Sequence, residues 1–304
     1  MAPEGGAMLH ERRFDTGTVE INYAEGPPNG PPLVVLHGGS ASWQYGQAFL
    51  EVLAERWHVY APDFRGHGKS GHVPGHYQVR DYAADTAAFL AGVVREPAIV
   101  FGHSLGGYTA LAVAAEHPDL VRAVIDGDAT LERKDHPVEE PTHKAQNVLW
   151  QTLAGRPVAE IATALRETPY LAPGETTPRR YADLVGEDSP WFAFQALNLH
   201  RLDPDMLAAV LAGPDYLLAG YDPERTLPAI ACPVLLLQAD PAAGGGLPDE
   251  DVRRALRFLR RGSHVRLVGV GHHLYEIPHV VEAITPFLEH VLGSEEEHPR
   301  GEAP

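Results

Sequence analysis

Residues 98–108 read AIVFGHSLGGY, a short apolar run that leads into Gly102-His103-Ser104-Leu105-Gly106 and then into an alanine-rich helical stretch. This is a G-x-S-x-G pattern between a strand and a helix, the setting in which a serine is held on a sharp turn with its hydroxyl exposed. Glycines on both sides remove the Cβ atoms that would collide where strand and helix pack closely. The helix over 105–116 aims its first N–H groups at the serine, where negative charge would develop. The pattern therefore predicts that Ser104 is a nucleophile.

Charge and cysteine content restrict the partners and the compartment. The 304 residues carry a formal net charge of −17, with 41 acidic against 24 basic residues. This sign is wrong for nucleic-acid binding, and no basic run offsets it. The single cysteine, Cys232, excludes an intramolecular disulfide and fits a reducing compartment. Because no apolar run of about 18 residues is present, we expect a cytoplasmic protein without a membrane partner.

Short apolar segments alternate with helical ones before residue 129 and after residue 231. Helices are expected around 46–55 and over 82–94, 105–116, 249–261 and 277–292. The expected strands are eight, at 12–17, 18–26, 32–36, 58–63, 98–101, 121–128, 233–240 and 264–270. This alternation predicts an α/β fold with a mostly parallel sheet covered by helices on both faces.

The intervening segment 129–231 is rich in helix formers and shows no strand pattern. A helical insertion between two strands of one sheet indicates a cap over the carboxyl edge of the sheet, where ligands bind in such folds. We therefore predict a core formed by 9–128 and 232–293, a helical cap or lid at 129–231, and flexible tails at 1–8 and 294–304.

A serine hydroxyl needs a base within hydrogen-bond reach, and the base needs an acid to orient it. His272 lies in Gly269-Val270-Gly271-His272-His273, on the loop after the last strand and at the same sheet edge as Ser104. Of the 17 histidines it is the one on a glycine-flanked loop before the final helix. We predict His272 as the base, in preference to His273, which would instead pack or line the pocket.

Three aspartates that lie between Ser104 and His272 in the chain could supply the acid. In hydrolases whose serine sits on a G-x-S-x-G turn, the chain order is serine, acid, histidine. Asp240 follows strand 233–239, the usual position, but its loop is glycine-rich and has no second carboxylate until Asp249. Asp128 ends its strand next to the cap. We predict Asp128, with Asp240 as the alternative acid and Asp126, deeper in its strand, as the third candidate.

Acyl transfer also needs donors for an oxyanion. His37-Gly38-Gly39-Ser40 directly follows strand 32–36 and matches the element that supplies one backbone N–H. We predict an oxyanion hole formed by the N–H groups of Gly39 and Leu105.

Taken together, these motifs resemble the α/β-hydrolase fold family, in its capped, esterase- or lactonase-like form, over nearly the full length. The likeness rests on HGGSAS (37–42), APDFRGHGKS (61–70), GHSLGG (102–107) and GVGHHLYEIP (269–278), each after its own strand. The resemblance implies an eight-stranded sheet with the cap inserted after the sixth strand, and a bracing role for the segment at 63–70. The loop 240–248 departs from the usual G-x-x-D spacing. In this it resembles members whose acid follows the sixth strand, such as zearalenone-type lactonases.

Two glycine-rich segments imitate nucleotide sites. Gly66 to Gly71 satisfies G-x-G-x-x-G, but Pro74 and Gly75 stand where a dinucleotide-binding helix should begin. Gly68-Lys69-Ser70 lacks the first glycine of a P-loop. No H-E-x-x-H or C-x-x-C spacing is present. We predict neither a cofactor nor a metal.

Aromatic residues of the cap favour a hydrophobic pocket. Trp150, Trp191 and Phe192 are expected to contact substrate, together with His103 beside the nucleophile. The prediction is a cofactor-free serine hydrolase, monomeric or homodimeric, that cleaves a small hydrophobic ester or lactone through an acyl-enzyme. The alternatives are a carbon–carbon bond hydrolase or perhydrolase on the same triad, and a slow-turnover ligand-binding receptor.

Overall fold

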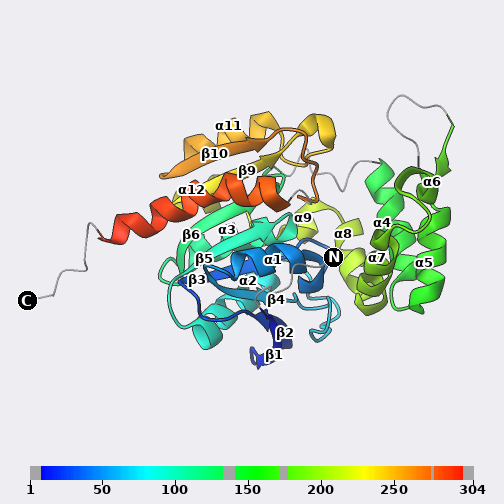
Figure 1. The fold of residues 1–304 in the computed structure, drawn as a ribbon, viewed down its shortest axis with the longest axis horizontal. Helices are drawn as coiled ribbons and strands as arrows, with labels where there is room; N and C mark the ends of the chain where they lie inside the picture. The colour runs from blue at the N-terminus through cyan, green and yellow to red at the C-terminus, as the bar shows by residue number, and fades with distance from the viewer. Residues whose placement is uncertain (1–7, 133–140, 171–176, 275–276, 297–304) are drawn as a thin grey trace, which may run out of the picture.

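The computed structural model describes residues 8–132, 141–170, 177–274 and 277–296, which form a central sheet with helices around it (Figure 1). The described sheet has eight strands in the order β1-β2-β4-β3-β5-β6-β9-β10. Their bounds are β1 His10–Asp15, β2 Glu20–Glu25, β3 Pro32–Leu36, β4 His58–Pro62, β5 Ala98–His103, β6 Val121–Gly127, β9 Val234–Ala239 and β10 Gly262–Leu267. The predicted eight-stranded α/β sheet is confirmed.

The strands from β4 to β10 run parallel, and β1 and β2 add an antiparallel edge. The register brings Gly102 of β5 opposite Leu36 of β3 on one side and Asp126 of β6 on the other. Because parallel strands end at the same edge of a sheet, the loops after β3, β5 and β6 meet there. This edge gathers the segments in which the chemistry was predicted.

Helices cover both faces of the sheet. Within β5, Ile99 and Phe101 point to the face packed by α1 and α12, whereas Val100 points to the opposite face. Because successive side chains point to opposite faces and both faces are covered, the central strands are mainly apolar, as expected for a sheet buried on both sides. The helices are α1 Gln47–Leu53, α2 Val79–Phe89, α3 Leu105–Glu116, α11 Asp249–Phe258 and α12 Ile277–Glu296, with the shorter turns η1 Trp43–Gly46, η2 Leu90–Val94 and η4 Pro241–Ala243.

The segment between β6 and β9 is mainly helical, as predicted. Figure 1 shows α4 to α7 together at one side of the sheet, where α5 packs on α7 and α4 on α8. Its elements are α4 Pro141–Leu153, α5 Val158–Glu167, β7 Pro169–Tyr170, β8 Arg179–Arg180, α6 Tyr181–Val185, α7 Pro190–Arg201, α8 Pro204–Leu211, α9 Pro214–Leu217 and α10 Pro223–Ala229. The two-residue ladder β7–β8 was not predicted, because two residues are too short to show alternation. The division of the chain into a core and a cap remains a prediction.

Helix α3 is buried on nearly all sides, between α2 and the sheet. A helix that is apolar all round belongs in the interior, and its alanines let it approach the strands closely. The described helices include none that is long and apolar enough to cross a membrane. The C-terminal tail was predicted to begin at residue 294, but α12 continues to Glu296.

Candidate active site

Ser104 occupies a strained turn between β5 and α3. Its φ is +51° and its ψ is −113°, a backbone conformation that residues other than glycine seldom adopt. The Ser104 N–H donates to the carbonyl of Gly127 at 3.0 Å, which fixes the turn to the end of β6. The hydroxyl is thereby held at the sheet edge, where it lines a cavity.

The flanking glycines are required by space. A Cβ on Gly102 would lie 2.1 Å from the carbonyl oxygen of Gly106, and one on Gly106 would lie 2.4 Å from that of Leu36. Both distances are far shorter than carbon–oxygen contact, so no other residue fits there without moving the backbone. The observed turn thus depends on the glycines predicted to permit it.

Asp128 follows β6 with a φ of +62° and is fully buried. Its Oδ1 accepts hydrogen bonds from the N–H groups of Ala239 at 2.9 Å and Leu247 at 3.1 Å. Its Oδ2 accepts one from the N–H of Gly246 at 2.6 Å. Three backbone donors from β9 and the following loop therefore surround this carboxylate and fix its orientation.

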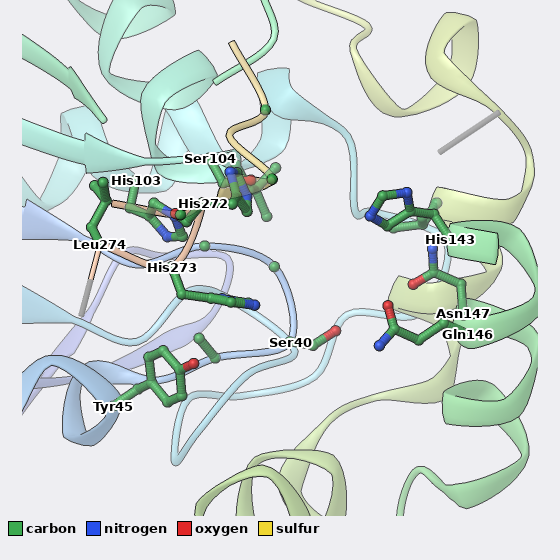
Figure 2. Close-up of a pocket in the computed structure, with 18 of the residues that line it drawn as sticks. Ser40, Tyr45, His103, Ser104, His143, Gln146, Asn147, His272, His273 and Leu274 are labelled. Atoms are coloured by element: carbon green, nitrogen blue, oxygen red, sulfur yellow. The ribbon is translucent and has the colours of Figure 1, made fainter. Parts of the chain in front are cut away.

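The same Oδ2 lies 2.7 Å from Nδ1 of His272. His272 stands on the loop between β10 and α12, and its ring lines the cavity at the same end as Ser104 (Figure 2). A carboxylate accepts only, so Nδ1 carries the proton and the other ring nitrogen, Nε2, has its lone pair available. The predicted serine, histidine and aspartate thus come together at one sheet edge.

The other two candidate aspartates have different surroundings. The oxygens of Asp240 accept from the N–H groups of Ala242 at 2.9 Å and Gly269 at 2.8 Å, and these bonds lower its pKa. Asp240 therefore caps a turn and braces a neighbouring loop. Asp126 is fully buried and lies against Gly107 of α3. Burial, together with the nearby charge of Asp128, raises the pKa of Asp126 well above its usual range, which favours the neutral carboxyl.

His103 connects the elbow to the histidine loop. Its Nε2 lies 2.7 Å from the carbonyl oxygen of His272, and the two rings are 4.9 Å apart. Because a carbonyl only accepts, Nε2 of His103 carries the proton. Burial and the neighbouring His272 lower the pKa of His103 well below 6.5, so the ring is neutral. His103 was predicted to contact substrate, and it does line the cavity.

The predicted oxyanion donors, Gly39 and Leu105, line the same cavity as Ser104. The loop that carries Gly39 is fixed by His37, whose Nδ1 lies 2.7 Å from the carbonyl of Gly38 and whose Nε2 accepts from the N–H of Phe64 at 3.0 Å. Burial lowers the pKa of His37 to about 4, which keeps the ring neutral. The Leu105 N–H is among the first of α3, which have no acceptor within a helix.

The loop at 61–70 is a brace rather than a phosphate site. Asp63 is fully buried and accepts from the N–H groups of Trp43 at 2.8 Å and Lys69 at 3.0 Å. A Cβ on Gly68 would lie 2.2 Å from this carboxylate, so the glycine turn closes around its own aspartate. Within the described ranges, no group of three or more His, Cys, Asp or Glu side chains is placed to hold a metal ion.

The cavity has a volume of about 600 Å³, within the usual range for small-molecule sites. Trp150 of α4 and Trp191 of α7 line it, as predicted. The prediction for Phe192 is wrong, because its side chain is fully buried and does not line the cavity. Its ring packs edge-on against Trp191 and lies beneath the guanidinium of Arg166, 4.9 Å from the ring centre. Consecutive helical residues point about 100° apart, which sends Phe192 toward α5.

Three polar residues of α4 that were not predicted also line the cavity, namely His143, Gln146 and Asn147. With Trp150 they follow the spacing i, i+3, i+4, i+7, which marks one face of a helix. The tryptophan was selected for its aromatic ring alone. The helical spacing around it would have identified the other three.

Comparisons with known proteins agree with the observed fold. The family model described as "alpha/beta hydrolase fold" matches residues 31–165. The chain is 30% identical over 259 residues to 2-(acetamidomethylene)succinate hydrolase of Mesorhizobium japonicum, covering 72% of this chain and 93% of that protein. A solved bacterial membrane phospholipase A superposes with a TM-score of 0.71 at 25% identity, covering 93% of this chain and 86% of that one. The solved E-2-(acetamidomethylene)succinate hydrolase superposes with a TM-score of 0.68 at 22% identity, covering 93% and 100%.

Proposed function

This chain belongs to the alpha/beta hydrolase fold family, and we propose that it is a cofactor-free serine hydrolase that cleaves a carboxylic ester or lactone. Its homologues support a hydrolase on this fold. The ester or lactone substrate and the roles of the individual residues are the proposal.

In the proposed reaction, Ser104 attacks the substrate carbonyl while Nε2 of His272 takes the hydroxyl proton. Asp128 keeps the proton on Nδ1 of His272 and stabilises the imidazolium that forms. The N–H groups of Gly39 and Leu105 donate to the oxyanion of the tetrahedral intermediate. His272 then returns its proton to the leaving alkoxide, and an acyl-enzyme remains on Ser104. A water molecule, deprotonated by His272, hydrolyses this ester and restores the serine.

One observation supports this function most directly, the 2.7 Å contact between a fully buried Asp128 and the ring of His272 in the cavity of Ser104. Three backbone donors bind a carboxylate whose fourth partner is an imidazole facing a cavity. Burying a carboxylate is costly even when all its oxygens have hydrogen-bond partners. A buried aspartate bound to a histidine at a cavity therefore indicates a function rather than a contribution to stability.

The cavity walls favour an uncharged acyl group over a sugar or a nucleotide. Trp150 and Trp191 present broad apolar rings, and Leu105, Met206 and Leu217 add aliphatic surface. The bacterial phospholipase A named above is an ester hydrolase by its name, which is consistent with ester cleavage here.

The experiment that tests the proposal is a panel of p-nitrophenyl esters and of small and macrocyclic lactones, assayed with purified protein and with Ser104→Ala as control. We expect turnover of at least one ester or lactone that Ser104→Ala abolishes. Turnover of a diketone carbon–carbon bond, with none of any ester or lactone, would instead support the first alternative. Binding without turnover of any of them would support the receptor.

A further inference from the structure

The wall of the cavity formed by α4 carries polar side chains beside the apolar ring of Trp150. Figure 2 shows His143, Gln146 and Asn147 of α4 directed into the space opposite Ser40 and His273. His143 and Gln146 are exposed and Asn147 is half-buried, so a molecule in the cavity can reach all three. Their two carboxamides offer both hydrogen-bond donors and acceptors at the cavity mouth.

Gln195 of α7 adds a third carboxamide to this wall. It lines the cavity, yet only 5% of its surface is exposed. Its Nε2 is buried and has no hydrogen-bond partner among the described residues. Leaving a buried amide donor unpaired costs about 1–3 kcal/mol, so native structures rarely retain one without a use. A half-turn of the carboxamide exchanges oxygen and nitrogen, so the group can offer a donor or an acceptor to a bound molecule.

Among the described residues that line the cavity there is no lysine, arginine, aspartate or glutamate. The carboxylate of Asp128 is fully buried and binds the ring of His272. Burial and the neighbouring His272 lower the pKa of His273 to about 4, so that imidazole is neutral as well. The whole chain carries a net charge of −17. An anionic substrate would therefore meet no lysine or arginine among the described lining residues, and the net charge of the chain would repel it on approach.

Resting on the serine hydrolase function above, we propose that the substrate is an uncharged ester or lactone with a hydrogen-bonding carbonyl, hydroxyl or amide group remote from the scissile bond. Gln146, Asn147 and Gln195 bind this group, while Trp150 and Trp191 hold the apolar part between it and Ser104. The three carboxamides can donate and accept, so they recognise a neutral polar group without requiring charge. The cavity selects an amphipathic acyl chain.

Three matched p-nitrophenyl esters test this proposal: the octanoate, the methyl adipate and the hydrogen adipate. They have similar length, and their remote ends are apolar, neutral and polar, and anionic. We expect kcat/KM to be highest for the methyl adipate and at least about tenfold lower for the hydrogen adipate, because burying an unpaired carboxylate is costly. A hydrogen adipate that is hydrolysed fastest would overturn the proposal.

Substitutions in α4 then test which residues bind the remote polar group of the substrate. Gln146→Leu and Asn147→Leu should each lower the ratio of kcat/KM for methyl adipate to that for octanoate by about tenfold, the effect of one hydrogen bond. Gln151→Leu makes the same chemical change on the same helix, outside the cavity lining, and should leave the ratio unchanged. An equal loss for both esters in the two cavity variants would overturn the proposal.

The outcomes separate this proposal from the function on which it rests. If no ester is hydrolysed and Ser104 does not react with a phosphonate probe, the serine hydrolase proposal fails and this inference fails with it. If esters are hydrolysed and the octanoate is preferred to the methyl adipate, the serine hydrolase stands and the amphipathic substrate is refuted.

Discussion

The substitution Asp128→Asn examines the proposed triad most sharply. Each carboxylate oxygen of Asp128 faces two N–H groups, Oδ1 those of Ala239 and Leu247 and Oδ2 those of Gly246 and His272. Asparagine replaces one oxygen with an amide nitrogen that donates. In either orientation the new NH₂ group therefore opposes two donors that formerly had an acceptor. If the NH₂ group replaces Oδ2, it faces Nδ1 of His272 and favours the tautomer with the proton on Nε2, which cannot take the serine proton.

These losses set the expected magnitudes. A triad acid replaced by its amide lowers kcat by about 10⁴-fold when the tautomer is lost. Two buried donors without acceptors lower the free energy of unfolding by about 2–6 kcal/mol in total, at about 1–3 kcal/mol each. We therefore expect an enzyme that still folds, with a reduced urea midpoint and almost no turnover.

The assay is kcat on a rapidly hydrolysed ester, measured beside a urea unfolding curve, with Asp240→Asn as matched control. Asp240 binds only two backbone N–H groups of its own loops, so we expect its variant to keep kcat within about threefold, as for most surface changes. If Asp240→Asn is the inactive variant and Asp128→Asn is near normal, the reasoning is refuted. If both lose only a few-fold, another group such as Asp126 orients the histidine.

Further expectations follow from packing and protonation. Gly106→Ala places a Cβ 2.4 Å from a carbonyl oxygen and should lower the free energy of unfolding by about 2 kcal/mol or more. Gly46→Ala is the control, because a Cβ at residue 46 meets nothing within 4 Å. Equal urea midpoints for the two variants would contradict this expectation. Burial lowers the pKa of His67 to about 3, so below 6.5 the unfolded chain binds a proton that the folded one does not. Stability should therefore fall by about 2 kcal/mol from pH 7 to 5 on account of this group, and His67→Leu should remove that part of the slope in urea titrations. His103→Leu removes the hydrogen bond to the carbonyl of the predicted base and should lower kcat/KM by about tenfold; an unchanged value would exclude a positioning role.

Much of the fold could be predicted because it depends on short-range pattern. The strand at 32–36 was placed at its observed bounds, since a continuous apolar run between glycine- and proline-rich segments has few other solutions. The end of the last strand was harder. It was expected at residue 270, but β10 stops at Leu267, where Gly269 turns with a φ of +76°. Strand pairing, which the sequence does not display, sets that boundary.

The candidate site likewise has residues that a local pattern identifies and others that depend on distant contacts. Ser104 and His272 were identifiable because each sits in a glycine-flanked loop with its own local signature. The choice among aspartates rested on loop lengths, whereas their observed surroundings depend on backbone donors more than 100 residues away, such as Gly246. For Phe192, the face of α7 that meets the cavity is decided by packing against α5, which no local pattern reveals.

Covalent labelling tests the central claim most directly, the claim that Ser104 is a nucleophile activated by His272. The purified protein would be treated with a fluorophosphonate, and the adduct counted by intact mass and located by peptide sequencing. We expect one adduct, on Ser104, that is absent in Ser104→Ala and forms about 10³-fold more slowly in His272→Ala. An adduct on another residue, or turnover by Ser104→Ala within tenfold of the unmodified protein, would contradict the account.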